Sequence, residues 1–190
     1  MKETFLFAKQ IVKRFRTTGA VAPSGKFLAR AMAEAVGEVA IGHTILELGP
    51  GTGVFTRELA KTFPQSRIVA VEINDDFAKQ IRKTMPSVKV IQACASQLDQ
   101  HIRELNIEPE DVAAVVSGLP LLSLPKDLGR SILASITRVL RPGRKYVQFT
   151  YSERAWRQFD VPGFNREPRR RIWMNVPPAV VLSFVRNETV

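Results

Sequence analysis

Residues 45–56 read Ile-Leu-Glu-Leu-Gly-Pro-Gly-Thr-Gly-Val-Phe-Thr, and this stretch decides the fold. A short apolar run ends in three glycines at alternate positions, Gly49, Gly51 and Gly53, and an amphipathic pattern follows them. Glycine tolerates positive φ and leaves room for a ligand against the backbone. The first N–H groups of a helix have no partner within the helix and are available to such a ligand. The stretch therefore predicts a strand, a ligand-binding glycine loop and a helix.

The spacing of the glycines and the acid before them indicate the kind of ligand. The pattern is G-x-G-x-G, whereas dinucleotide-binding folds carry G-x-G-x-x-G. Glu47 precedes the first glycine by two residues and would place a carboxylate at the tip of the strand. A carboxylate there suits a cationic group, and the methionine end of S-adenosylmethionine carries an ammonium. We therefore predict that Glu47, Gly49, Gly51 and Gly53 bind S-adenosylmethionine.

A second acid follows the next apolar run, which ends Val-Ala-Val-Glu-Ile-Asn. Glu72 is then at the carboxyl end of the second strand, where an acid can accept hydrogen bonds from both hydroxyls of a ribose. Ile73 is expected to pack on the adenine face. The alternatives are a surface glutamate at a strand end and an isoleucine that belongs to the core.

Short apolar runs alternate with amphipathic stretches along most of the chain, which predicts parallel strands joined by helices. Such an alternation gives a doubly wound α/β fold with a mostly parallel sheet and helices on both faces. We expect strands at Thr44–Leu48, Arg67–Val71, 88–93, Val112–Ser117 and Lys145–Thr150, and helices at 53–63, Asp75–Thr84, 95–105 and 127–140. Residues 172–175 and 180–186 are expected to form an antiparallel C-terminal hairpin at the sheet edge. Two N-terminal helices, at 2–17 and 25–37, precede the first strand.

Composition limits the classes of protein to which the chain can belong. Its 28 Lys and Arg against 18 Asp and Glu give a net charge of +10, which favours anionic partners such as phospholipid surfaces or nucleic acid. Cys94 is the single cysteine, so an internal disulfide or a cysteine-based zinc site is excluded, and no metal is expected. No apolar run reaches the roughly 20 residues that cross a bilayer. We expect a cytoplasmic protein with one domain, at residues 19–190, after an extension at residues 1–18.

The N-terminal extension has the pattern of an amphipathic helix. One face carries apolar side chains and the other carries positive charges, respectively Phe5, Ala8, Val12, Phe15 and Lys2, Lys9, Lys13, Arg16. This composition is typical of a helix that lies in a membrane interface, where each basic residue near an anionic surface adds about 1 kcal/mol. Residues 1–18 are therefore expected to associate with an anionic membrane surface, unless the phenylalanine face packs on the domain instead.

Taken together, these motifs resemble those of class I S-adenosylmethionine-dependent methyltransferases. More closely, the chain resembles the bacterial phospholipid N-methyltransferases, relatives of the ribosomal RNA adenine dimethylases. The resemblance rests on residues 19–24, 46–56, 71–72, 117–125 and 147–151. It implies transfer of methyl groups from S-adenosylmethionine to the amine of phosphatidylethanolamine and its methylated derivatives, towards phosphatidylcholine. Such an enzyme would associate peripherally with the inner face of the cytoplasmic membrane.

The chain departs from this family after the third strand. Similar enzymes carry an acid there, within Gly-Asp-Ala, that holds the adenine amino group. The corresponding residues here are Ala93, Cys94 and Ala95. A thiol is a weak donor and a weak acceptor. Cys94 and Ala95 are therefore expected beside the adenine, with a weakened side-chain contact or one from the backbone.

The segment after the fourth strand indicates the kind of substrate. Residues 117–121 read Ser-Gly-Leu-Pro-Leu, where related adenine dimethylases carry Asn-Leu-Pro-Tyr to receive a planar base. No stacking ring is offered, so an aliphatic amine is favoured over a flipped base. Ser117 and the carbonyl of Gly118 are predicted to accept hydrogen bonds from the amine, and the ring of Tyr151 to contact the ammonium. The alternatives are a buried turn for Ser117 and Gly118 and a plain edge-strand aromatic for Tyr151.

The candidate site includes no general base, and the segment before the last strand carries a run of arginines. His43 and His101 are expected on the surface, so water is the expected proton acceptor. The arginines at 169–171, within a predicted loop at 156–173, are expected to flank a lipid headgroup, unless they form a solvated charge run. Two other functions stay open: an RNA adenine methyltransferase, and a membrane-binding protein with degenerate catalysis.

Overall fold

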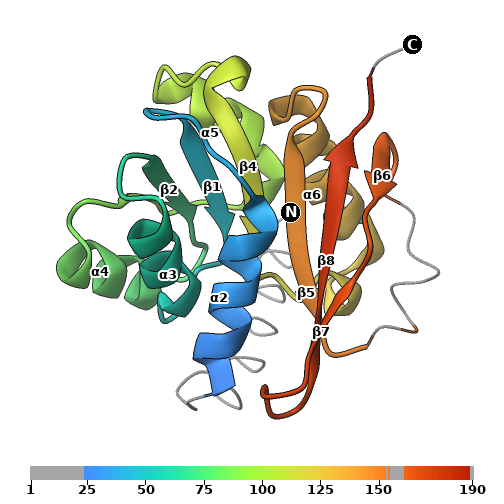
Figure 1. The fold of residues 1–190 in the computed structure, drawn as a ribbon. Coiled ribbons are helices and arrows are strands. Elements are labelled where there is room, and N and C mark those ends of the chain that lie inside the picture. The colour runs from blue at the N-terminus through green and yellow to red at the C-terminus, as the bar shows by residue number, and fades with distance from the viewer. Residues whose placement is uncertain (1–23, 153, 155–160, 189–190) are drawn as a thin grey trace.

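A computed structural model describes residues 24–152, 154 and 161–188 and shows a mixed, eight-stranded sheet with helices on both faces (Figure 1). The strand order is β3-β2-β1-β4-β5-β8-β6, with β7 also paired to β8. The strands are β1 Thr44–Leu48, β2 Arg67–Val71, β3 Lys89–Ile91, β4 Val112–Ser117, β5 Lys145–Thr150, β6 Phe164–Arg166, β7 Arg170–Ile172 and β8 Ala179–Arg186. The helices are α2 Ser24–Val36, α3 Val54–Thr62, α4 Asp75–Thr84, α5 Leu98–Glu104 and α6 Lys126–Val139, with 3₁₀ turns η1 Ala95–Gln97, η2 Pro109–Asp111 and η3 Leu121–Ser123.

The parallel half of the sheet confirms the predicted doubly wound fold. Strands β3, β2, β1, β4 and β5 pair in parallel, in that order. The chain moves outward in one direction from β1 through β2 to β3, and then returns to the other side of β1 for β4. The loops after β1 and β4 therefore diverge, and a crevice opens at the carboxyl ends of these two strands.

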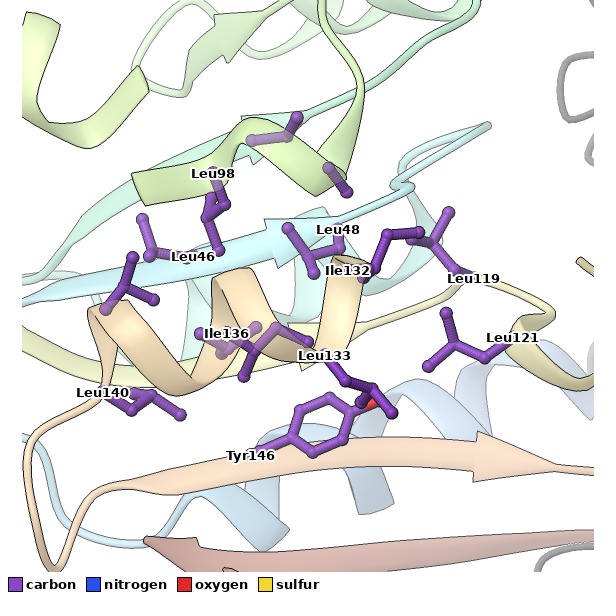
Figure 2. Close-up of a cluster of buried hydrophobic side chains, with 14 of the residues drawn as sticks. Leu46, Leu48, Leu98, Leu119, Leu121, Ile132, Leu133, Ile136, Leu140 and Tyr146 are labelled. Carbon is purple, nitrogen blue, oxygen red and sulfur yellow. The ribbon is translucent and has the colours of Figure 1, made fainter. Parts of the chain in front are cut away.

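Two apolar layers hold the helices on the sheet. The central strand β1 is buried along its whole length, because its alternate side chains enter opposite layers. Leu46 and Leu48 pack with α5 and α6, as Figure 2 shows around Ile136, whereas Ile45 packs with α2, α3 and α4. Helices on both faces explain why the parallel strands have continuous apolar sequences rather than alternating ones.

A polar clamp joins α5 to α6. Arg138 donates from Nε and Nη2 to the two carboxylate oxygens of Asp99, at 2.8 and 3.1 Å, and Ser135 Oγ donates at 2.7 Å. The hydrogen bond from Arg138 is the main cause that lowers the pKa of Asp99 to about 2. The carboxylate therefore stays charged and the clamp stays closed at any ordinary pH.

The C-terminal part of the sheet differs from the prediction in its details. The antiparallel hairpin is present, but its first strand is β7, and residues 173–178 form the turn instead of strand 172–175. Its second strand, β8, is not at the edge: it lies between β5 on one side and β6 and β7 on the other. Pro177 and Pro178 account for the shift, because proline has no N–H for a strand ladder and terminates it.

Several other boundaries also differ from expectation. The third strand is three residues long and not six, and the helix expected from residue 95 begins with the 3₁₀ turn η1. The segment expected as a loop at 156–173 contains β6 and β7. The helix expected at 25–37 is α2, whereas the amphipathic helix predicted at residues 1–18 lies outside the described residues, as do residues 156–160. Among the described helices, none combines the length and apolar character needed to span a bilayer.

Candidate cofactor and substrate site

The glycine loop between β1 and α3 has the predicted backbone. All three glycines have positive φ, at 66° for Gly49, 57° for Gly51 and 78° for Gly53, which caps α3. A Cβ atom added to Gly53 would lie 2.5 Å from Cε of Met85. Positive φ therefore favours glycine at all three positions, and the close packing against Met85 adds to this at Gly53. Gly49, Pro50 and Thr52 of the loop line a cavity.

Glu72 connects the second strand to the glycine loop. Its carboxylate is 1% exposed; Oε2 accepts a hydrogen bond from the N–H of Gly51 at 3.0 Å, and Oε1 accepts one from the N–H of Asn74 at 2.9 Å. The Asn74 side chain in turn caps α4 by accepting from the N–H groups of Asp76 and Phe77. The two predicted cofactor elements are therefore in contact, and a ribose in this position would meet a carboxylate of fixed orientation.

Glu47 lies one residue before the end of β1 and is fully buried. Its Cα partners across the sheet are Ala70 in β2 and Val116 in β4. The strand thus holds this carboxylate two residues before Gly49, next to the start of the glycine loop. This placement is compatible with the predicted contact to the methionine ammonium, which stays a prediction.

A narrow apolar hollow of about 30 Å³ adjoins the loop. It brings together four predicted residues, Gly49, Ile73, Cys94 and Ala95. Six further residues come from β2, the β3–η1 segment, the β4–η3 loop, the η3–α6 segment and α6, namely Val71, Ala93, Leu119, Leu124, Leu128 and Ile132. The thiol of Cys94 accepts a hydrogen bond from Ser96 Oγ, at 3.2 Å. An adenine ring lying against this hollow would meet apolar side chains, which is compatible with the role that the sequence predicts for these residues; that role stays a prediction.

A larger cavity of about 320 Å³ lies on the other side of Gly49 and Leu119, which line both spaces. Gly118 and Tyr151 line it, as predicted, together with residues of α2, the glycine loop and β5. None of the described residues in its wall carries a charged side chain. His43 and His101 are half-buried rather than exposed and lie outside this wall. An uncharged cavity in a chain of net charge +10 suits a neutral, partly apolar substrate.

Ser117 does not line this cavity. Its side chain is fully buried at the end of β4, and its Oγ accepts a hydrogen bond from the N–H of Leu119 at 3.3 Å. Gly118 extends the pairing of β4 with β1 by one residue, because its N–H donates a hydrogen bond to the carbonyl of Leu48 at 2.8 Å. Within the predicted pair, Gly118 is therefore placed to meet a substrate, and Ser117 shapes the turn that presents it.

Three aromatic rings form one wall of the cavity. Phe149 lies between Phe55 and Tyr151, with edge-to-face contacts at centroid distances of 5.5 and 5.4 Å. Of the three rings, Tyr151 alone is predicted from the sequence. The spacing of Phe149 and Tyr151 was the available signal, because residues two apart on a strand share a face. Ring faces attract cations, so this wall can contact an ammonium group without a carboxylate.

Gln148 holds the loop after β4 against β5. Its Oε1 accepts from the hydroxyl of Tyr146 at 2.9 Å, and its Nε2 donates to the carbonyls of Leu119 and Phe149, at 3.1 and 2.8 Å. Burial raises the pKa of Tyr146, so its hydroxyl stays protonated and remains a donor. The network fixes Leu119 where the two cavities meet, and the sequence reasoning assigned no such role to Gln148.

Comparisons with known proteins agree with this geometry. The family described as "Methyltransferase domain" matches residues 45–143. An ornithine lipid N-methyltransferase of Singulisphaera acidiphila is 32% identical over 190 residues, which covers 94% of each chain. The chain belongs to a lipid N-methyltransferase family. Its cofactor is accordingly S-adenosylmethionine, whereas the contacts of the glycine loop and Glu72 with it stay predictions.

Two further matches cover less of the chain or share less of its sequence. The small subunit ribosomal RNA methyltransferase A of Thermosynechococcus vestitus is 32% identical over 108 residues, which is 57% of this chain and 38% of that protein. The N-methyltransferase NodS of Bradyrhizobium japonicum, solved with S-adenosyl-L-homocysteine, has a TM-score of 0.69 at 14% identity and covers 89% of this chain and 90% of its own. The structural likeness confirms the fold, including the antiparallel C-terminal strands.

Proposed function

We propose that this methyltransferase transfers methyl groups to the amine of a membrane lipid, with phosphatidylethanolamine and its methylated derivatives as the substrates and phosphatidylcholine as the end of the series. The observation that carries the proposal is the uncharged cavity beside the glycine loop, whose wall includes three aromatic rings. The resemblance in the segments at 117–125 and 147–151 supports a phospholipid. The relative from Singulisphaera acidiphila, which acts on an ornithine lipid, supports a lipid amine more generally.

The chain's own residues supply position rather than acid–base chemistry. When bound, S-adenosylmethionine supplies a methyl group, and a neutral amine forms the C–N bond as the methyl–sulfur bond breaks with its electron pair left on sulfur. Such an in-line displacement depends mainly on alignment. The carbonyl of Gly118 accepts an amine N–H and aims the nitrogen, whereas the rings of Phe55, Phe149 and Tyr151 contact the headgroup while it is cationic, both as the incoming ammonium and as the methylated product. No described residue in the wall is a carboxylate or a histidine, so the amine proton leaves to water.

An ornithine lipid is the second candidate substrate, and an RNA adenine is the third. The ornithine lipid N-methyltransferase, which aligns with 94% of this chain, favours ornithine lipid over RNA. The partial match to a ribosomal RNA methyltransferase favours RNA, but Leu121 stands in the cavity wall where a stacking ring would receive a base. A protein with degenerate catalysis would combine membrane binding with loss of turnover, a possibility raised by Cys94.

The test incubates the protein with labelled S-adenosylmethionine and one of three methyl acceptors. These are vesicles of phosphatidylethanolamine, vesicles containing ornithine lipid, and RNA. We expect label in phosphatidylethanolamine, and its loss in Glu47→Ala, with Glu38→Ala, a change at an exposed glutamate, as the control. Label in ornithine lipid alone would transfer the assignment to that substrate. Label in RNA, with binding that weakens steeply as salt rises, would overturn the lipid proposal, and cofactor binding with no labelled product would indicate degenerate catalysis.

A further inference from the structure

The turn between β7 and β8 exposes an unusual set of side chains. Residues 173–178 read Trp-Met-Asn-Val-Pro-Pro, and every residue except Asn175 is exposed. The exposed fractions are 68% for Trp173, 63% for Met174 and 77% for Val176. Single exposed apolar residues are ordinary on proteins, whereas a contiguous group usually marks a surface that binds something.

The turn has a fixed structure, because its single polar residue faces inward. Asn175 is 2% exposed, and its Nδ2 donates to the carbonyl of Pro177 at 2.6 Å. The residue before the turn, Ile172, is buried in the core and pairs with Ala179 across the hairpin. The polar group of the turn is therefore satisfied within the protein, and its apolar groups point away from it.

The turn also borders the mouth of the large cavity. Asn175 lines the cavity, as do Leu122 and Tyr151, which are 37% and 47% exposed. Figure 1 shows the β7–β8 turn at the same end of the molecule as the start of α2 and the end of β5. A surface that covered residues 173–178 would therefore face the opening through which a substrate enters.

Positive charge lies directly beside these apolar side chains. The guanidinium carbon of Arg171 is 4.9 Å from the centroid of the Trp173 ring, and Arg169 and Arg170 precede it in the chain. Tryptophan concentrates at the interface between lipid and water, and arginine pairs well with phosphate. An arginine stacked on an exposed tryptophan, in a chain of net charge +10, fits an anionic lipid surface better than an apolar protein groove.

We propose that residues 173–178 insert into the surface of a bilayer that contains anionic phospholipid, with the mouth of the cavity turned towards the membrane. These residues are distinct in sequence from the segment at residues 1–18, which lies outside the described part of the chain. The purpose of the orientation rests on the proposed function: the amine of a lipid can enter the cavity while its acyl chains stay in the bilayer. Vesicle binding by the turn does not depend on catalysis.

The binding test compares two asparagine substitutions in the full chain. Val176 and Ile41 are both 77% exposed, but Ile41 precedes β1 at the opposite end of the strands, so Ile41→Asn is a matched control for Val176→Asn. We expect Val176→Asn to lower the partition onto vesicles of phosphatidylglycerol and phosphatidylcholine by about fivefold to tenfold, and Ile41→Asn to leave it within twofold. Equal losses in the two variants, or none in either, would overturn the proposal.

A second readout reports on the turn itself. The chain has two tryptophans, so Trp156→Phe leaves Trp173 as the single emitter. We expect its fluorescence to shift to shorter wavelength on anionic vesicles and to be quenched by lipids brominated on the acyl chain. No shift would overturn insertion. A rise in molar mass in light scattering without vesicles, abolished by Val176→Asn, would instead make the turn a protein interface and would also overturn it.

Activity measurements separate this proposal from the proposed function. A monomeric short-chain phosphatidylethanolamine reaches the cavity without a bilayer, so Val176→Asn should methylate it at the parent rate but methylate vesicle lipid more slowly. Equal rates for the parent and Val176→Asn on vesicle lipid would contradict the proposed role of the turn and leave the proposed function untouched. Normal vesicle binding by a parent that methylates neither form of the lipid would reject the lipid substrate and leave the membrane surface standing.

Discussion

Replacement of Glu72 by glutamine tests the cofactor site most directly. The carboxylate is buried and accepts two backbone hydrogen bonds, from Gly51 at 3.0 Å and Asn74 at 2.9 Å. Glutamine has the same shape but a single acceptor oxygen, so its NH₂ group must face one of the two N–H donors. A hydrogen bond to a charged group contributes about 1.5–3 kcal/mol, and an unsatisfied buried donor costs about 1–3 kcal/mol. We expect unfolding free energy to fall by about 2 kcal/mol and the cofactor dissociation constant to rise by about 10- to 100-fold.

Calorimetric titration with S-adenosylhomocysteine measures the dissociation constant, and urea denaturation of the same samples measures stability. Glu38→Gln is the control, because Glu38 is exposed and lies in the connection between α2 and β1, outside the glycine loop. If Glu72→Gln loses stability but binds the cofactor within twofold of the parent, Glu72 serves only to hold the loop. The assignment of this acid to the ribose would then be wrong, even though the fold assignment would remain.

Three further changes test the loop, the aromatic wall and the clamp between α5 and α6. Gly53→Ala should lower the free energy of unfolding, measured in urea, by about 2–3 kcal/mol, because left-handed backbone costs about 1–2 kcal/mol and the new methyl group meets Met85. Gly143→Ala is the control, because Gly143 has a similar φ and an added Cβ would meet nothing within 4 Å. It should lower the free energy of unfolding by the backbone contribution of about 1–2 kcal/mol only. Phe149→Leu should raise KM for the amine about threefold to tenfold, because one cation-binding ring is lost; an unchanged KM would remove the ring from substrate binding. Asp99→Asn should lower the free energy of unfolding by about 1–2 kcal/mol at pH 7. The pKa of Asp99 is lowered in the folded parent, so the stability that its charge contributes is lost as the carboxylate is protonated. The difference in unfolding free energy between parent and variant, measured in urea, should therefore shrink below pH 3.8 and vanish as pH falls through about 2.

The parallel half of the fold and the cofactor side of the site could be predicted because their signals are local. The apolar run, the glycines and the start of the amphipathic segment lie together at residues 45–56. The helix that joins two parallel strands crosses with one handedness, so the arrangement of such a unit follows from its order in the chain. Glu72 could be found because the carboxyl ends of neighbouring parallel strands meet at one edge. In the structure the N–H of Gly51 donates a hydrogen bond to the carboxylate of Glu72.

The rest depends on pairing between distant segments, which periodicity does not report. Strand β8 was recognised as a strand, but its position between β5 and β6 follows from contacts across the sheet. The ring of Phe55 meets Phe149 only after β1 and β5 have been brought to opposite sides of β4. Ser117 illustrates a limit of another kind, because a strand-end serine can face the cavity or its own backbone with the same sequence.

The place of β8 within the sheet also sets an order of folding. Strands β1 to β5 are linked by βα units whose partners are near in the chain, so they can pair early, at a small cost in loop closure. The outer edge of β5 gains its hydrogen bonds only when β8 arrives from beyond the long segment after Thr150. In hydrogen-exchange experiments on refolding protein, the β5 amides that face β8 should therefore gain protection after those of β1. Until then the cavity lacks its Asn175 wall, so we expect the chain to form the crevice between β1 and β4 before it completes the large cavity beside it.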